Sequence, residues 1–213
     1  MVSFFENRKI LGFVLWVIAI FAIAEGIGCI IDGFSSDSSS FIPDEADNRE
    51  FYGCLSGIGM IIAGLIYALF SSAISRGSVS KKIDILAGLV RMVGLTTIIT
   101  GIFDGIAWIL CTDEIGAGIV STIISILIGA LIMWIGGRIN DGKADVGDII
   151  IWLVLLVLML ILVLLLFLAL IGATLALDLG LILVILEIVC KLILYLFVIA
   201  FLCDRGVRKS MNM

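Results

Sequence analysis

Three residues near the C-terminal end of the chain could do chemistry inside a membrane. Glu187, Lys191 and Tyr195 are spaced i, i+4 and i+8, so they would share one face of a helix. They lie in an apolar run, 179–202, that is long enough to cross a hydrocarbon core of ~30 Å. Lys191 falls about 18 Å along that helix. A charge near mid-bilayer costs between ~3 and more than ~10 kcal/mol, so both charges should face protein or trapped water.

This charged face has two interpretations, and the sequence leaves both open. The first is a proton or ion relay, or an anchor for a substrate. In the second, the pair fixes the register of the helix bundle, because a glutamate on the N-terminal side of a lysine is the favourable order for an i, i+4 ion pair. If the geometry were poor, a proton would pass from Lys191 to Glu187 and both would become neutral.

Three further charged residues lie inside apolar runs. Arg91 could extend its head group to the cytoplasmic interface. Glu25 needs water or a partner on another helix, and Asp104 lies near the outer end of its run. With Glu187 and Lys191 they would form a ladder of charges through the bundle. This ladder is the sharpest hypothesis for transport that the sequence offers.

An enzymatic function has less support, because the chain has no histidine. That excludes histidine metal ligands, Ser-His triads and imidazole proton shuttles. An acidic segment, Asn140, Asp141, Asp145 and Asp148, superficially resembles the magnesium-binding motif of membrane prenyltransferases, but its spacing departs from that pattern. We therefore expect a protein that is not an enzyme, with no cofactor, no metal site and no nucleic-acid partner.

Two cysteines near the outer ends of their runs, Cys54 and Cys111, could form a disulfide in an oxidising compartment. The alternative is that they are ordinary packing residues, as apolar membrane cysteines usually are. No Cys-x-x-Cys pair occurs, which argues against a metal site built from cysteines.

The composition defines the elements that must position these residues. Hydrophobic residues make up 62% of the 213-residue chain and charged residues 15%, with a single proline and a mean hydropathy of +1.32. A soluble domain could not bury so much apolar surface. The sequence predicts an all-α integral membrane protein, 1–213, that is one polytopic domain with an outer loop at 32–50. Its six predicted spans are 10–31, 51–74, 83–110, 115–135, 149–177 and 179–202.

The basic residues predict the orientation in the membrane. In a six-span arrangement, ten lysines and arginines fall in loops and termini on one side, and only Arg49 falls on the other. The positive-inside rule then puts both termini in the cytoplasm of a cell-membrane protein. The alternative for the first run is a cleavable signal peptide ending near Ala22-Ile23-Ala24, but the apolar run continues past that point.

Rows of small residues predict where the helices approach closely. They recur every four residues in the second, third and fourth runs, which favours packing ridges over ligand sites: Gly53, Gly57, Thr97, Gly101, Gly105, Ser121, Ser125 and Gly129. The leucine-rich run 149–177 lacks such a row. We expect it at the bundle edge, facing lipid or a second copy in a homo-oligomer, and either tilted or ending early near Gly172. We interpret the acidic, serine-rich loop 32–50 as a solvated connector between two helices.

Similar segments recur along the chain and favour three tandem hairpins. Ile30-Ile31-Asp32-Gly33 is matched by Ile102-Phe103-Asp104-Gly105, and each even-numbered run leads into a basic segment. The run Gly57–Ile66, which leads to Arg76, resembles the even helices of the HdeD-like acid-resistance membrane proteins. The resemblance implies six spans in repeated hairpins and a role in stress, and no catalytic residues. The chain lacks the outer-turn prolines frequent in those repeats.

Two functions are consistent with the sequence. The first is a non-enzymatic membrane protein with a structural or stress-related role. The alternative is a small secondary transporter or proton-coupled channel that uses the intramembrane Glu, Lys and Arg residues.

Overall fold

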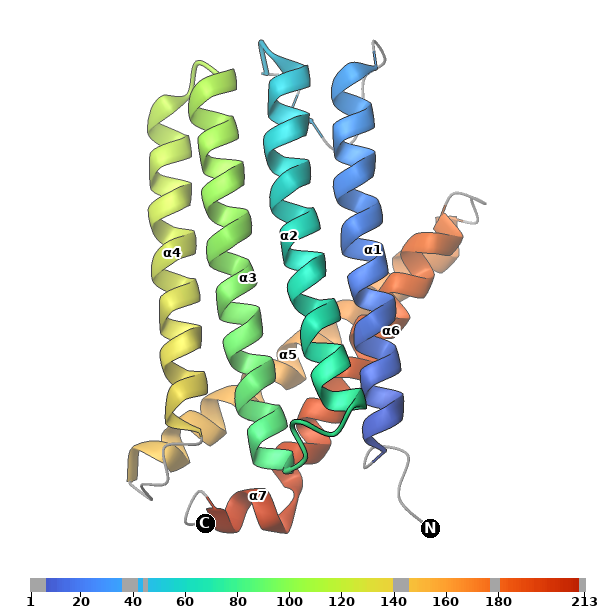
Figure 1. The fold of residues 1–213 in the computed structure, drawn as a ribbon, viewed down its shortest axis with the longest axis vertical. Helices are drawn as coiled ribbons and strands as arrows, with labels where there is room; N and C mark the ends of the chain where they lie inside the picture. The colour runs from blue at the N-terminus through green and yellow to red at the C-terminus, as the bar shows by residue number, and fades with distance from the viewer. Residues whose placement is uncertain (1–6, 36–41, 44–45, 140–145, 177–180, 211–213) are drawn as a thin grey trace. The chain divides into compact units, whose positions relative to one another are not determined.

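The regular elements of the computed structural model are all helices, as predicted (Figure 1). The structure describes residues 7–35, 42–43, 46–139, 146–176 and 181–210. The helices are α1 (Arg8–Phe34), α2 (Arg49–Ser75), α3 (Lys82–Cys111), α4 (Ile115–Arg138), α5 (Val146–Ala176), α6 (Leu181–Cys203) and the short α7 (Arg205–Ser210).

Six helices are long and apolar enough to cross a membrane, which confirms the six predicted spans. A helix satisfies its own backbone hydrogen bonds, as hydrocarbon demands. The predicted bounds of α1 to α4 agree with the observed helices to within a few residues. Helix α5 continues through Gly172 to Ala176, so the prediction that it ends early near Gly172 is wrong. A glycine lowers the stability of a helix but does not necessarily end it.

The chain divides into two compact units. Unit 1 comprises Met1–Ile18, Leu69–Leu89 and Ile135–Met213, and unit 2 comprises Ala19–Ala68 and Val90–Trp134. Unit 2 therefore contains the later part of α1, most of α2, the later part of α3 and most of α4. Unit 1 contains the remaining segments of these helices, together with α5, α6 and α7. The pairs α1·α2, α3·α4 and α5·α6 are in contact, as three tandem hairpins require.

In unit 2 the four helical segments lie side by side in chain order (Figure 1). Close contact between α1 and α2 depends on glycine. A Cβ atom at Gly26 would lie only 2.6 Å from the carbonyl oxygen of Gly57 and 2.8 Å from Cγ1 of Ile61. Gly53 likewise faces the backbone of Cys29 and Gly33. The predicted ridge on α2 is therefore confirmed, and its partner is a matching row of small residues on α1.

Helices α3 and α4 also approach each other closely at glycine residues. A Cβ atom at Gly94 would lie 2.6 Å from the carbonyl oxygen of Gly129, and Gly101 faces Ser125. Ser121, which was predicted to join this ridge, is exposed instead. Thr122 takes its place and packs against Gly105. A row with strict four-residue spacing drifts about 40° per step around a helix of 3.6 residues per turn, so Ser121 has left the contact face.

The described part of the loop 32–50 packs within unit 2, contrary to the expectation of a solvated connector. Ile42 and Ala46 are 3% and 8% exposed and pack with Tyr52, Ala107 and Cys111. The amide of Asp47 donates a hydrogen bond of 2.8 Å to the carbonyl oxygen of Cys111. Burial of the loop's apolar side chains outweighs its acidic character at this point.

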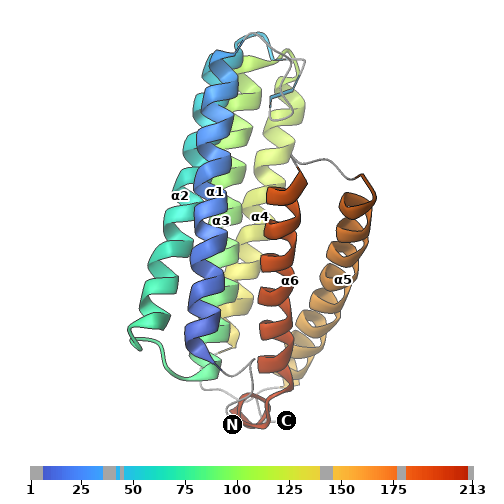
Figure 2. The same ribbon diagram turned by 90° about the vertical axis from the view of Figure 1, so that its right-hand side faces the viewer.

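In unit 1, α5 and α6 form an antiparallel hairpin (Figure 2). The indole Nε1 of Trp152 donates a 2.7 Å hydrogen bond to the carbonyl oxygen of Leu202 at the end of α6. Phe197 and Phe201 stack edge to face along the packing side of α6. Elsewhere in unit 1, the Ser71 hydroxyl donates to the carbonyl oxygen of Gly12, joining α2 to α1 at 2.6 Å.

Two helices expose most of their apolar side chains. Only 11% of the most apolar window is buried in each of α4 and α5. For α5 this agrees with the expected lipid-facing or subunit-facing position. For α4 it was not expected, because its row of small residues occupies one narrow stripe while isoleucines and leucines cover the rest of its circumference.

Two glycines of α1 provide a test of the close contact. Gly26→Ala should lower the thermal midpoint in detergent, because the added methyl group meets the α2 backbone and overpacking costs about 1–3 kcal/mol. Gly28→Ala is the matched control, since no atom lies within 4 Å of its Cβ position. It should leave the midpoint unchanged or raise it. Equal midpoints in the two variants would contradict the packing described.

Candidate functional site

The charged face on α6 forms as an ion pair within one helix. The ammonium of Lys191 contacts the carboxylate of Glu187 one turn earlier. The side chain of Glu187 is 14% exposed and that of Lys191 is 41% exposed, so the acid is the sheltered member of the pair. Tyr195 lies one turn further along and is half-buried. Each charge of the pair therefore meets an opposite charge on its own helix.

A second polar group lies between α2 and α3 within unit 2. Tyr52 and Ser56 are one turn apart on α2, and Asp104 and Trp108 are one turn apart on α3. The rings of Tyr52 and Trp108 meet edge to face, with centroids 6.3 Å apart. The side chain of Ser56 is the polar neighbour of Asp104. These four residues are the α2–α3 polar cluster.

In the polar cluster Tyr52 and Ser56 are buried and Asp104 and Trp108 are half-buried, and two of its buried polar atoms have no protein partner of normal geometry among the described residues. Ser56 is 3% exposed. Its Oγ lies beside Asp104 and Tyr52 but makes no hydrogen bond of normal geometry, and the buried Nε1 of Trp108 has no acceptor. The loop residues Ile42 and Ala46 cover this end of the cluster through their packing on Tyr52 and its neighbours. Buried polar groups without a partner are rare and call for an explanation.

The sequence pointed to Asp104 but missed Tyr52, Ser56 and Trp108. A signal was present, because two polar or aromatic pairs with i, i+4 spacing occur in consecutive helices. It could be used only with the knowledge that these two faces meet. Gly59, one turn below Ser56, packs against Phe103 of α3, and this close approach fixes which faces are opposed.

The other members of the predicted charge ladder have different surroundings. Arg91 is exposed on α3, and the extension of its head group to the interface stays a prediction. Glu25 is half-buried on α1 and has an interaction partner. Glu25, Arg91 and Asp104 belong to unit 2, and Glu187 and Lys191 to unit 1. The continuous ladder stays a prediction.

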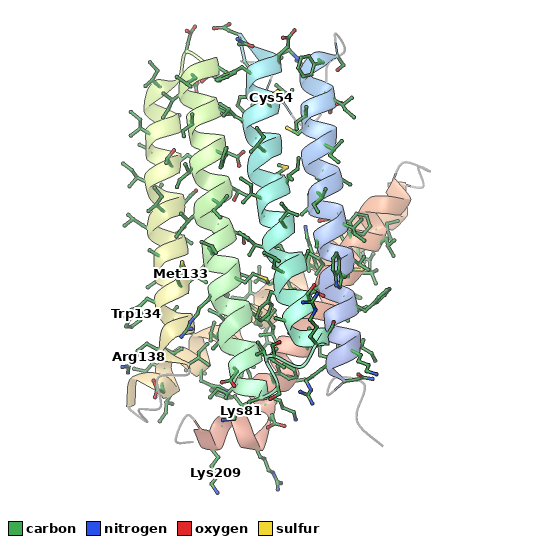
Figure 3. All side chains as sticks on the ribbon, viewed as in Figure 1. Cys54, Lys81, Met133, Trp134, Arg138 and Lys209 are labelled. Carbon is green, nitrogen blue, oxygen red and sulfur yellow. The ribbon has the colours of Figure 1, made fainter. Side chains whose placement is uncertain are left out.

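Cys54 and Cys111 are both free thiols in the structure, so the predicted disulfide is not formed there. Helix geometry explains why. Tyr52 and Ser56 face α3, which carries Cys111, and residue 54 lies about 160–200° around α2 from both. Cys111 is buried in the cluster of Tyr52 and Ala107, whereas Cys54 is half-buried near the N-terminal end of α2 (Figure 3). Pairing in an oxidising compartment stays a prediction.

The acidic segment after α4 takes part in a structural contact at its described residue. Asp148 is 2% exposed, and one of its carboxylate oxygens lies 3.5 Å from a guanidinium nitrogen of Arg138. This pair joins the end of α4 to the start of α5. Asn140, Asp141 and Asp145 lie outside the described residues. Within the described ranges, no group of three or more His, Cys, Asp or Glu side chains could hold a metal ion.

A further ion pair, which the sequence did not suggest, joins α3 to the C-terminal segment. Lys82 contacts the carboxylate of Asp204, the residue between α6 and α7. Oδ1 of Asp204 also accepts hydrogen bonds from the amides of Gly206 (2.8 Å) and Val207 (3.3 Å), so it caps the start of α7. These residues border an open pocket of about 330 Å³ that Lys81 also lines.

The Lys82–Asp204 contact predicts a pH dependence. The Lys82 ammonium holds the pKa of Asp204 below its ordinary value, and the amides of Val207 and Gly206 act in the same direction. A carboxyl with a lowered folded-state pKa stabilises the protein above its unfolded pKa of about 3.9, and this contribution is lost as the pH falls through the lower folded value. Asp204→Asn should therefore lower stability at pH 7 by about 0.5–1.5 kcal/mol.

The difference between wild type and Asp204→Asn should shrink as the pH falls below about 4, as measured by thermal unfolding in detergent. Asp113→Asn, which removes an exposed acid from the α3–α4 turn, is the control. A difference that stays constant from pH 7 to pH 3 would exclude the ion pair as its cause.

Comparison of the chain with models of known protein families, with curated proteins and with solved structures gives no match. The resemblance to the HdeD-like proteins therefore has no support from a family match, and what the fold shows is the coarser property. The chain is a multi-pass, all-helical membrane protein with six candidate spans.

Proposed function

We propose that this chain is a non-enzymatic membrane protein whose helical hairpins serve a structural role in the bilayer. The observation that carries this proposal is the Glu187–Lys191 ion pair. Its members lie one turn apart on the same helix, so each charge meets an opposite charge within α6 itself. A relay needs groups that exchange partners during a cycle, whereas a pair within one helix stabilises one arrangement.

The proposed orientation has both termini in the cytoplasm of a cell-membrane protein. It is supported by the basic residues of unit 1, where Lys81 and the exposed Arg205 and Lys209 lie at the ends of helices. Clusters of this kind flank spans on the cytoplasmic side. Arg8 lies at the start of α1 and donates to the carbonyl oxygen of Ser80, so the N-terminus shares this basic end.

A homo-oligomer through α5 is part of the proposal. The side chains of Leu153, Val157 and Leu164 are about half exposed, and the helix carries its apolar residues around most of its surface. Lipid or a second copy would cover this surface equally well. The support for the stress-related role is the resemblance of Gly57–Ile66 to the HdeD-like proteins.

Proton-coupled transport is the second candidate, and the α2–α3 polar cluster favours it. Asp104 is a carboxylate within a membrane span, and its polar neighbour Ser56 is almost fully buried. Intramembrane acids are costly and frequently mark ion or proton pathways. Glu25, half-buried on α1, is the other acid in unit 2 that such a pathway could use.

A flux measurement separates the two functions. Purified protein is reconstituted into sealed liposomes that carry a trapped pH-sensitive dye, and a pH gradient is imposed. The structural role predicts that wild type and Glu187→Gln dissipate the gradient at the rate of protein-free liposomes. Glu50→Gln, which changes an exposed acid, is the matched control. Faster dissipation in wild type than in protein-free liposomes would overturn the structural role in favour of transport, through Glu187 if Glu187→Gln abolishes it and through Asp104 if Asp104→Asn does.

A further inference from the structure

We infer that the α2–α3 polar cluster is a proton-binding site, in which a bound water molecule links Trp108 and Ser56 to the carboxylate of Asp104. This inference goes beyond the structural role, because it assigns a ligand to residues that the role does not use. It holds whether or not the protein transports protons.

The positions of the four side chains follow from helix geometry and from the contacts in unit 2. Residues 52 and 56 share one face of α2, and residues 104 and 108 share one face of α3. The Tyr52–Trp108 ring contact and the packing of Gly59 on Phe103 show that these two faces meet. Trp108 therefore lies opposite Tyr52, and Asp104 lies opposite Ser56.

The unpartnered atoms indicate what binds. The indole Nε1 of Trp108 can only donate a hydrogen bond, whereas the Ser56 hydroxyl can donate and accept. A bare metal cation would leave the indole N–H without an acceptor. A water molecule accepts from Trp108 and donates to Asp104, and it can exchange a further bond with Ser56. Buried waters typically make about three hydrogen bonds of this kind.

The groups around Asp104 do not neutralise its carboxylate, so a proton can bind there. The titratable groups that face it are the Cys29 thiol from α1 and the Tyr52 phenol from α2, both of which are neutral in their ordinary state near pH 7. No lysine or arginine forms an ion pair with Asp104 in the part of the chain that the structure describes. A carboxylate in hydrocarbon needs a cation, a proton or several hydrogen-bond donors. Here the groups present are hydrogen-bond donors.

The proton transfer is balanced without any other reactant. A hydronium ion from the aqueous phase gives its proton through the bound water to an oxygen of Asp104. The carboxylate becomes a neutral carboxylic acid, and water is released or retained. Protonated Asp104 can then donate a hydrogen bond to Ser56, whose hydroxyl accepts as readily as it donates.

Infrared difference spectroscopy of the full chain in lipid bilayers tests the site. Stepping the pH from 8 to 4 should produce a carboxylic-acid carbonyl band that is insensitive to Glu114→Gln, an exposed acid at the α3–α4 turn. Asp104→Asn should remove this band, and Asp104→Glu should keep it at a shifted frequency. If Asp104→Asn fails to fold, the Asp104→Glu frequency shift decides alone. A band that neither variant alters would overturn the inference.

The bound water has its own readout. Trp108→Phe and Ser56→Ala each remove one partner of the water, so each should move the midpoint of the Asp104 band by about one pH unit or more. Trp134→Phe is the control, because Trp134 is 58% exposed on α4. Unchanged midpoints in both cluster variants would exclude the water link, and a shift in Ser56→Ala alone would reduce the site to a direct Ser56–Asp104 contact.

Discussion

Hydrocarbon accepts neither unpaired backbone groups nor unpaired charge, and the rest of this structure depends on that constraint. The backbone satisfies it by forming six long helices. Charged side chains within the spans have different surroundings. Lys191 pairs with Glu187 within one helix, Asp104 lies against a buried hydroxyl, and Arg91 is exposed on α3. Most of the remaining charges lie near helix ends, where Lys82 and Asp204 join two segments of unit 1.

This constraint does not by itself hold the helices together, and glycine residues are what allow them to associate. Between apolar helices in lipid there is little hydrophobic driving force, so association depends on close van der Waals contact. Gly26 and Gly57 bring the α1 and α2 backbones together, and Gly94 and Gly129 do the same for α3 and α4. The polar cluster also depends on a glycine, because Gly59 allows α2 to approach α3.

The sequence predicted the parts of this structure that depend on one helix at a time. Hydropathy predicted the spans, and the i, i+4 spacing predicted the Glu187–Lys191 pair. The parts it missed depend on which faces of two helices meet. The position of Ser56 becomes informative only once Asp104 is known to lie opposite it, and Cys54 lies on the side of α2 that is turned away from α3. The Lys82–Asp204 contact joins residues 122 positions apart, which no local pattern predicts.

The most direct test of the account is whether the α6 pair is satisfied internally. Lys191→Leu leaves Glu187 without its partner, whereas Glu187→Gln with Lys191→Met removes both charges at nearly constant volume. The account predicts that the single variant unfolds in detergent with a thermal stability lower than that of the double variant by about 1–3 kcal/mol, a range reduced from fully buried pairs because Lys191 is partly exposed. Equal stability of the two variants would contradict this, since a sheltered carboxylate that loses the cation it contacts must cost free energy.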